Sequence, residues 1–540
     1  MNAPRREIEG QSVRWDQARA DEAYVSGLWV RETLAEALAR EAAAAPERVL
    51  LIDGGVRLDC GTLQARANEL AQALMARFPR GSVISFMLPN WHEAAIIYLG
   101  VTLAGMVAHP VMPSLRDHDL LFMLKDVGSR MIFVPADLRG FDYRAMMDRI
   151  APQFATAPET VVLRGDAGAH TAFDALFGAA TNAPLPVMEP DAVRMVLYTS
   201  GTTGSPKGVL HSHNSIHALI RQLGDHWLVE PGDRFLVPSP IAHIGGSIYA
   251  FEMPLLLGTT AILMERWDPV PAVEILASQR CTHMAGATPF LEGILRAAGE
   301  AGTHLPDLKL FICGGASVPP SLIRSAADYF DKAVVTRVYG STEVPVTTVG
   351  VIDRNDVAHA AETDGAPGIA EVRLVDEREQ AGDEGEIRAR GPQMLVGYLH
   401  AEDEAKVFDA AGFYRTGDLA RRVDGRFLVV SGRSKDIIIR NGENISPKEI
   451  EDMLVDHPEI AEVAIVGVPD ARTGERACAV IVPRGDARPD VASLRAFLDR
   501  QGVAIFKMPE QVDIRPSLPK NDAGKVLKHE LRAMLRPKES

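Results

Sequence analysis

A run of hydroxyl side chains, glycines and one lysine follows an apolar stretch at residues 196–208, VLYTSGTTGSPKG. Glycines let a backbone approach a ligand closely, hydroxyl groups donate hydrogen bonds to phosphate oxygens, and Lys207 adds a positive charge. Because Lys207 lies between Pro206 and Gly208, the segment does not match the GxxxxGK[ST] loop of simple kinases and GTPases. A flexible surface turn is the alternative for this composition. The apolar run before the loop and the single lysine favour a phosphate site.

Further stretches join apolar runs to polar or glycine-rich ends. They are PIAHIGGS at 240–247, ICGGASV at 312–318, VYGSTEV at 338–344, YRTGDLA at 414–420, GRSKDIIIRNGENISPKEIE at 432–451 and LPKNDAGKVLKHEL at 518–531. Taken singly, each has an ordinary explanation, because glycine pairs and TGD make turns and a lysine near a chain end is usually a solvated charge.

Two histidines, His211 and His213, follow the first loop and raise the question of a metal site. A third ligand at suitable spacing is absent from the sequence, so structural roles are favoured for both.

Composition restricts the class of protein. The 540 residues include 57 Lys and Arg against 72 Asp and Glu, a formal charge of −15 that would repel a nucleic-acid backbone. Hydrophobic residues at 46% and charged residues at 24% are typical of globular domains. The length predicts several domain-sized units.

Cysteine usage and the apolar runs predict a cytoplasmic protein without a membrane span. The four cysteines lie far apart and form no CxxC pair, which indicates neither a zinc cage nor a disulfide framework. The first residues are charged and lack the apolar core of a secretory signal. The longest apolar run, residues 94–108, is shorter than a bilayer requires, and we expect it to form a buried helix.

The elements that must position these residues alternate in type along most of the chain. From residue 29 to about 153, helix-period stretches alternate with short apolar runs such as VLLID and SVISFML, which predicts α/β layers. Beyond about residue 365, shorter strand-like pieces and an Asp424-Gly425 hairpin signal predict a β-rich subdomain. Beyond residue 433 we expect a smaller α+β domain. Ligands of such sheets bind beyond the carboxyl ends of the strands, where several of these motifs lie.

The motifs resemble, in content and order, those of the adenylate-forming superfamily of acyl-CoA synthetases, nonribosomal-peptide adenylation domains and luciferases. The loop matches the family pattern [ST]SG[ST][ST]GxPKG throughout, and the resemblance extends from about residue 25 to 535. It implies a large N-terminal domain of layered α/β subdomains with a β-rich subdomain, residues 1–433, and a small mobile α+β domain, residues 434–540. The overall texture is most similar to bacterial acid:CoA ligases of the cyclohexanecarboxylate or medium-chain type.

The resemblance also implies roles for individual residues. The ATP-binding set would be Thr199, Ser200, Gly201, Thr202, Thr203, Gly204, Lys207, Gly314, Gly315, Ala316, Tyr339, Gly340, Asp418, Arg433 and Lys435. Within it, Tyr339 would stack on adenine, Asp418 would accept hydrogen bonds from both ribose hydroxyls, and Arg433 would contact ribose or phosphate. Thr342 would hydrogen-bond phosphate, Glu343 would hold Mg²⁺, and Lys525 would be the catalytic lysine.

A two-step reaction follows from the resemblance. A carboxylic acid would attack the α-phosphorus of ATP and release pyrophosphate, and the thiol of coenzyme A would then attack the acyl-adenylate and release AMP. Lys435 would be the pivot about which the small domain rotates, so that Gly442 and its neighbours replace Lys525 between the steps.

The acyl group of the substrate acid is expected to carry no charge. PIAHIGGS would line the acyl pocket, with His243 near the carboxylate and the thiol path as a gate or wall. Gly245 and Gly246 would leave room for acyl bulk. Apart from Glu343 and Arg337, the pocket segments carry no charged residue, which favours a medium-chain, alicyclic or aromatic acid.

The sequence leaves three other functions open. They are a freestanding adenylating enzyme that loads a carrier protein, a luciferase-like oxygenase, and an inactive nucleotide-binding scaffold. A homodimer is possible in each case.

Overall fold

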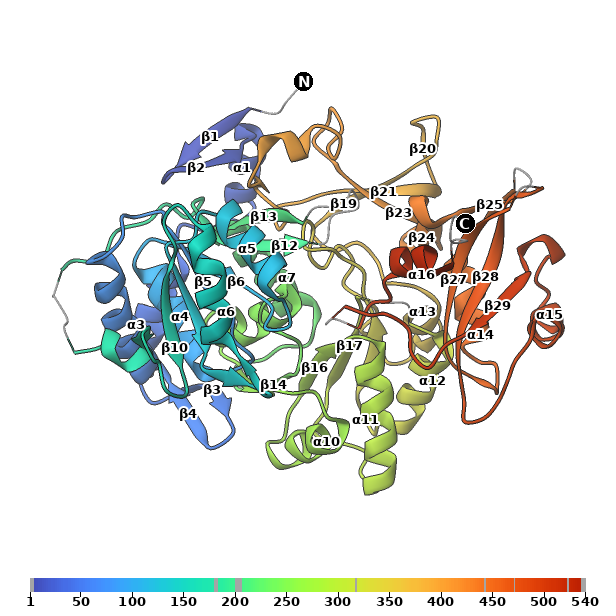
Figure 1. Ribbon diagram of the computed structural model, residues 1–540, viewed down its shortest axis with the longest axis horizontal. Helices are drawn as coiled ribbons and strands as arrows, with labels where there is room; N and C mark the ends of the chain where they lie inside the picture. The colour runs from blue at the N-terminus through green and yellow to red at the C-terminus, as the bar shows by residue number, and fades with distance from the viewer. Residues whose placement is uncertain are drawn as a thin grey trace.

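The computed structural model describes residues 4–178, 183–199, 206–315, 318–440, 443–470, 472–521 and 524–535 (Figure 1). It is a mixed α/β structure, as the sequence predicts. Two largely parallel sheets and one antiparallel sheet form the N-terminal part. A smaller unit formed by the last part of the chain lies at the right of Figure 1, in orange and red.

The first sheet holds the strand that leads into the hydroxyl-rich loop. In spatial order its strands are β11 (Thr171–Ala172), β10 (Glu159–Leu163), β7 (Met131–Pro135), β5 (Val83–Phe86), β6 (Val107–Pro110), β12 (Val193–Thr199), β13 (Lys207–Ser212) and β22 (Gly397–Tyr398). The strands from β11 to β12 run parallel, and β13 and β22 are antiparallel to their neighbours. The central strands are buried along their whole length, which explains why they appear as unbroken apolar runs in the sequence.

The second sheet carries the glycine pair at the end of one of its strands. Its order is β18 (Val334–Arg337), β17 (Leu310–Cys313), β16 (His283–Gly286), β14 (Arg234–Val237), β15 (Thr260–Leu263), β3 (Val49–Asp53) and β4 (Val56–Asp59). All these neighbours are parallel except β3 and β4.

Helix α4 (His92–Leu103) lies between the two sheets and contacts β5 and β6 of the first and β3 of the second. Burial on all sides explains why its sequence is apolar all round. The expectation of one helix over residues 94–108 is therefore wrong in extent. The helix ends at Leu103, Gly105 adopts a positive φ of 67° that suits a turn, and the chain continues as β6.

The other helices cover the outer faces of the sheets and the ends of the strands. In the N-terminal part they are α1 (Gln17–Val25), α2 (Leu34–Ala44), α3 (Cys60–Met75), α5 (Asp117–Asp126), α6 (Tyr143–Ile150), α7 (His213–His226), α8 (Ile244–Ser247), α9 (Met253–Leu256), α10 (Pro269–Ser278), α11 (Thr288–Ala301), α12 (Pro320–Tyr329) and α13 (Val357–Glu362). Helix α11 packs against both α10 and α12, and α10 and α11 lie below β16 and β17 in Figure 1.

The third sheet is antiparallel and contains the TGD motif. Its order is β20 (Ala381–Gly382), β19 (Glu371–Val375), β21 (Glu384–Arg390), β23 (Tyr414–Val423) and β24 (Phe427–Arg433). The hairpin expected at Asp424-Gly425 joins β23 to β24, and both residues have positive φ. Its loop is one residue longer than the two-residue signal suggests, because Arg426 also lies outside the paired strands.

The small C-terminal unit begins after β24 and has the α+β composition expected. Strands β26 (Glu443–Ile445), β25 (Ile438–Arg440), β28 (Gly474–Pro483) and β27 (Ile460–Asp470) form its sheet, and β29 (Gln511–Ile514) pairs with β28. Helices α14 (Pro447–Leu454), α15 (Val491–Arg500) and α16 (Lys528–Leu535) pack on it. Ser446 caps α14 by accepting a hydrogen bond from the Glu449 amide, but the Glu449 carboxylate pairs with Lys507 instead of closing a capping box.

Two further features concern the ends of the chain and its apolar helices. Residues 5–14 form a hairpin of β1 (Arg5–Ile8) and β2 (Gln11–Arg14), which the sequence reading did not anticipate. Across the described ranges, the helices are all too short or too polar to span a bilayer.

Candidate active site

Tyr339, Asp418 and Arg433 meet at one end of the antiparallel sheet. Asp418 on β23 is the cross-strand partner of Arg433 on β24, so the two side chains can lie on one face. Arg433 Nε is 3.0 Å from Asp418 Oδ1, and the Tyr339 hydroxyl donates to Asp418 Oδ2 at 2.7 Å. Burial, reinforced by the Asp418 charge, holds the pKa of Tyr339 well above its usual value, so Tyr339 stays a hydrogen-bond donor.

Lys525 of the C-terminal unit joins this group. It lies on a turn in which the Lys525 amide donates to Asn521 Oδ1 at 2.8 Å, and the flanking residues 520 and 526 form an antiparallel bridge. Lys525 is exposed on the surface of this turn, and neighbouring protein atoms partly desolvate its ammonium. This desolvation, followed by repulsion from Arg433, lowers the pKa of Lys525 to about 8, although Asp418 acts in the opposite direction.

Lys435 lies in the connection between the two parts of the chain, in the turn η5 (Ser434–Asp436), and is exposed. Desolvation and the charge of Arg433 lower the pKa of Lys435. Arg433, Lys435 and Lys525 therefore form a cluster of positive charge near two carboxylates, Asp418 and Asp436. Such a cluster suits an anionic ligand.

Glu343 is buried beside two tyrosines, Tyr398, which lies outside the predicted motifs, and Tyr414, the first residue of the YRTGDLA segment. The Tyr398 hydroxyl donates to Glu343 Oε1 at 3.0 Å and lies 3.2 Å from the Tyr414 hydroxyl. The backbone is also held, because the Leu395 amide donates to the Glu343 carbonyl at 2.7 Å. In the described chain, no lysine or arginine forms an ion pair with Glu343. Its carboxylate is thus a buried acceptor without a protein counter-charge, which fits a hard divalent cation.

Thr342, the neighbour of Glu343, is positioned by His211. His211 Nε2 lies 2.7 Å from the Thr342 carbonyl oxygen, and its Nδ1 lies 3.2 Å from Ser215 Oγ. The other histidine, His213, accepts from the Leu34 amide through Nδ1. Burial lowers the pKa of His211 to about 4, so its ring is neutral. These contacts agree with structural roles for both histidines.

The hydroxyl-rich loop connects two paired strands, since Thr199 ends β12 and faces Lys207 at the start of β13. Ser200, Gly201, Thr202, Thr203 and Gly204 lie outside the described residues. Lys207 Nζ is 3.1 Å from Asp403 Oδ1, in the turn η4 (Ala401–Glu404), and 5.4 Å from the centroid of the Tyr398 ring. Tyr398 thus contacts the loop lysine through its ring and Glu343 through its hydroxyl.

The glycines near the strand ends are needed for packing. A Cβ on Gly314 would lie 2.9 Å from the Val338 carbonyl oxygen, and one on Gly340 would lie 2.5 Å from the Val346 amide nitrogen. Gly315 has a φ of +82°, which a glycine adopts without strain. Ala316 lies outside the described residues.

The expected acyl segment forms a short helix and a turn. His243 precedes α8, its carbonyl accepts from the amides of Gly246 and Ser247, and its side chain is half-buried. The space around Gly245 is open, whereas a Cβ on Gly246 would lie 2.1 Å from the Pro240 carbonyl oxygen. The expectation that both glycines leave room for an acid is therefore wrong for Gly246.

Charges near this segment are paired within the protein. Arg337 lies 2.7 Å from Asp364 and is buried. Glu252, in the π-helical turn η3 (Ile248–Glu252) that follows α8, lies 2.9 Å from the buried Arg194. This pair was not predicted from the sequence, although a single glutamate inside an apolar run indicates that a buried positive partner is needed.

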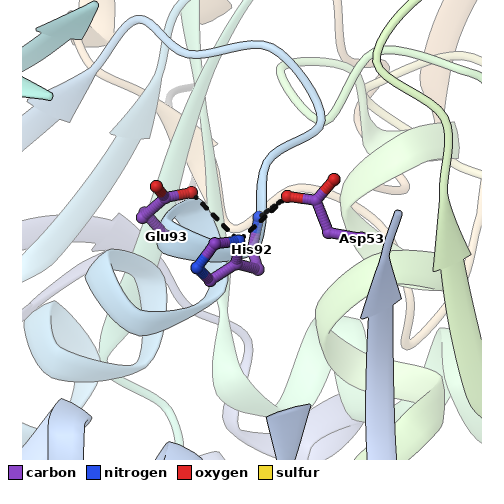
Figure 2. A group of neighbouring side chains, drawn as sticks. All are labelled: Asp53, His92 and Glu93. Atoms are coloured by element: carbon purple, nitrogen blue, oxygen red, sulfur yellow. Dashed lines mark hydrogen bonds and ion pairs between the residues drawn. The ribbon is translucent and has the colours of Figure 1, made fainter. Parts of the chain in front are cut away.

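A separate cluster, Asp53, His92 and Glu93, has the composition of a metal site (Figure 2). His92 Nδ1 lies 2.9 Å from Asp53 Oδ2 and 3.3 Å from Glu93 Oε2. Arg164, which Figure 2 does not draw, places Nη2 2.8 Å from Asp53 and 2.7 Å from Glu93. Because a guanidinium already neutralises both carboxylates, we assign no metal to this cluster.

Comparison with known proteins agrees with this picture. The family model of AMP-binding enzymes matches residues 38–399, and that of the AMP-binding enzyme C-terminal domain matches residues 449–525. The chain is 33% identical to the medium-chain fatty-acid–CoA ligase of Escherichia coli K12 over 94% of this chain and 91% of that protein. It is 30% identical to pyochelin synthase PchD of Pseudomonas aeruginosa PAO1, over 97% of this chain and 96% of that protein.

The fold has a counterpart among solved structures. ATP-bound MatB from Rhodopseudomonas palustris superposes with a TM-score of 0.82 at 28% identity, covering 93% of this chain and 98% of that one. The two family models together span most of the chain, including the segments that carry Glu343 and Lys525. The chain therefore belongs to the adenylate-forming family of AMP-binding enzymes, which includes acyl-CoA ligases.

Proposed function

We propose that this protein is an AMP-forming carboxylic acid:CoA ligase. The observation that carries the proposal is the meeting of Lys525 with Asp418 and Arg433, because it unites a lysine from the C-terminal unit with the TGD motif of the N-terminal part. A lysine on a separate unit can move away from the site. This suits a reaction in which negative charge develops on phosphate in the first step and not in the second.

In the first step, an oxygen of the substrate carboxylate forms a bond to the α-phosphorus of ATP as the bond to pyrophosphate breaks. Lys525 and Arg433 stabilise the negative charge on the phosphate oxygens, and Lys207 with the loop before it steadies the departing pyrophosphate. Asp418 accepts hydrogen bonds from the ribose hydroxyls, so its contact with Tyr339 orients both the carboxylate and the ring that covers adenine.

Glu343 would hold Mg²⁺, which would supply charge neutralisation for the ATP phosphates, and the hydroxyl of Thr342 would hydrogen-bond phosphate. Tyr398 fixes the Glu343 carboxylate by donating to one of its oxygens, and Leu395 fixes its backbone. Among the described residues no lysine or arginine pairs with this carboxylate, so its charge would be met by the cation.

In the second step, the thiol sulfur of coenzyme A forms a bond to the acyl carbon, and AMP leaves with the oxygen that came from the acid. We propose that residues 434–540 rotate about Lys435 between the steps and withdraw Lys525. The predicted boundary at residues 433 and 434 coincides with the end of β24. Gly442, which would replace Lys525, lies outside the described residues.

The acid is proposed to be an uncharged medium-chain, alicyclic or aromatic one. The open space at Gly245 and the internal pairing of Arg337 support this, since a Cβ at Gly245 would meet no atom within 4 Å and the Arg337 charge is already neutralised by Asp364. Similarity to a medium-chain fatty-acid–CoA ligase points the same way. We propose that His243 is a gate or wall of this pocket.

A freestanding enzyme that passes the adenylate to a carrier-protein thiol is the second candidate. The similarity to pyochelin synthase PchD over nearly the whole chain favours it. Both candidates share the first step and differ in the thiol. A cytoplasmic location is part of the proposal, and the four cysteines, which are buried free thiols, agree with a reducing compartment.

A pyrophosphate-release screen over carboxylic acids, run with and without coenzyme A, tests the proposal. We expect turnover that requires both ATP and an uncharged acid, with multiple turnovers only when coenzyme A is present. Multiple turnovers to free acyl-adenylate without coenzyme A would overturn the ligase assignment.

A further inference from the structure

A cavity of about 1220 Å³ lies between the N-terminal segment and the chain around β22. Its walls come from residues 13–29, which include α1, from residues 390–396 before β22, and from residues 404–412 after it. In the part of the chain that the structure describes, none of the residues predicted to bind ATP, metal or the acid lines this cavity. It is large enough for a small-molecule ligand and needs its own explanation.

The cavity wall contains one arginine whose charge is not balanced. Arg14 lies 3.3 Å from Glu404, and Arg390 lies 2.5 Å from Glu371, so both have carboxylate partners. Arg19 forms no ion pair with a carboxylate among the described residues, although it lines the same cavity. Its charge is therefore available to a ligand.

The surroundings of Arg19 increase the benefit of an anion. One guanidinium nitrogen of Arg19 lies 3.7 Å from the Met394 sulfur, a weak acceptor, and the side chain is half-buried. Burial, followed by repulsion from Arg390, lowers the pKa of Arg19 to about 10. A partly desolvated cation beside a second cation is stabilised by an oxyanion, and the guanidinium fork matches carboxylate or phosphate geometry.

Asp16 and Glu371 of the wall partly offset the charge of Arg19 without forming an ion pair with it, and three other carboxylates of the wall are held by other groups. Glu404 is bound by Arg5 as well as Arg14, Asp191 accepts from Tyr24 and Asn214, and Asp409 accepts from backbone amides of its own turn. These three carboxylates are thus used for structure.

Aromatic rings form another part of the wall. Trp15 and Trp29 lie with ring centroids 6.2 Å apart, and Trp29 Nε1 donates to the Pro392 carbonyl at 3.0 Å across the cavity. The Arg14 guanidinium covers the Phe408 ring at 3.5 Å. Rings fixed in this way offer flat apolar surface to a ligand body.

We propose that this cavity is a second ligand site that binds an oxyanion carried on an aromatic or apolar body, with Arg19 contacting the oxyanion and Trp15 and Trp29 contacting the body. Carboxylate and phosphate are the two sources of such an oxyanion. The site is separate from the proposed ligase site, so either can fail without the other.

Binding is measured on the full chain by tryptophan fluorescence and by calorimetry, in saturating AMP so that the nucleotide site is filled. The probes are phenylacetate, phenyl phosphate, inorganic phosphate and benzyl alcohol, which separate the oxyanion from the ring. We expect saturable binding of phenylacetate or phenyl phosphate, at least tenfold tighter than that of benzyl alcohol or inorganic phosphate. The aromatic anion whose affinity falls in the Arg19→Met variant identifies the oxyanion of this site, because phenylacetate can also enter the acyl pocket.

Arg19→Met removes the charge while keeping much of the side-chain length, and should weaken this binding about 10- to 100-fold, the usual effect of losing a charge-assisted hydrogen bond. Arg19→Lys should retain more affinity than Arg19→Met. Arg31→Met, at an exposed arginine outside the cavity, is the matched control and should bind like the parent protein. Melting temperature and AMP binding verify folding. Equal affinity of the parent and Arg19→Met, or no binding of either aromatic anion, refutes the site.

Discussion

Replacing Lys525 by alanine should separate the two proposed half-reactions. The ammonium is the mobile cation of the cluster around Asp418, and removing one preorganised donor from a developing oxyanion costs about 3–4 kcal/mol, or 10²- to 10³-fold in rate. Arg433 stays in place in the variant, so we expect the adenylation rate to fall by about 10²-fold, the lower end of that range. Thiolation of a supplied acyl-adenylate should fall less than about tenfold, because Lys525 is withdrawn in that step.

The pKa of Lys525 gives this prediction a second test. With a pKa of about 8, the side chain is about 90% protonated at pH 7 and about 10% protonated at pH 9. Because the charged form is the one that stabilises phosphate, the adenylation rate should be near its maximum at pH 7 and below, and should fall to about half near pH 8 and further at higher pH. Lys525→Arg should move this fall to higher pH.

Single-turnover quench-flow assays of each half-reaction provide the measurement. Lys520→Ala is the matched control, since Lys520 lies on the same turn but pairs with Glu462 at 2.6 Å, and it should affect neither step more than about threefold. Equal loss of both half-reactions in Lys525→Ala would refute the reasoning, as would an adenylation rate that is flat from pH 7 to 9.

Three further predictions concern the contacts around the site. Asp418→Asn should raise the KM for ATP about 10- to 100-fold in the pyrophosphate-release assay, because a charged acceptor is lost, and an unchanged KM contradicts its role at the ribose. Tyr398→Phe should raise the Mg²⁺ concentration needed for half-maximal activity about 2- to 10-fold, and should weaken Mn²⁺ binding by a similar factor in electron paramagnetic resonance titrations. Metal binding equal to that of the parent protein contradicts a role of Tyr398 in positioning Glu343. Gly245→Leu should shift acid preference toward shorter acids without a change in melting temperature. Gly246→Ala should instead lower the free energy of unfolding by about 1–3 kcal/mol in urea titrations, and the reverse pattern excludes the proposed pocket wall.

Much of the fold could be predicted because its signals are local. The buried parallel strands appear as apolar runs, and helices α14 and α15 show the expected periodicity. The errors also have local causes. Residues 94–108 are uniformly apolar because both α4 and β6 are buried, so hydrophobicity alone could not locate the turn between them. The β1–β2 hairpin turns at Glu9-Gly10, where both residues have positive φ, and Glu-Gly is not one of the strong hairpin dipeptides such as Asn-Gly or Asp-Gly.

The site could be predicted only in part. Its motifs are continuous in sequence, whereas the residues that contact and orient them come from distant segments. Glu343 and Lys207 were named from their motifs, but Tyr398 and Asp403, which contact them, belong to no motif and come from a distant segment. Asp403 carries no sequence signal at all, because a carboxylate in a polar turn is ordinarily solvated. Such partners follow from strand pairing, here β13 with β22, which a single sequence does not determine.

Isotope transfer tests the central claim most directly. The acid identified in the screen is labelled with ¹⁸O in its carboxylate and incubated with ATP, Mg²⁺ and coenzyme A. The masses and amounts of the products are then measured by mass spectrometry. We predict equimolar AMP, pyrophosphate and acyl-CoA, with one ¹⁸O atom in each AMP. Formation of ADP, or of AMP without ¹⁸O, would contradict attack of the acid on the α-phosphorus.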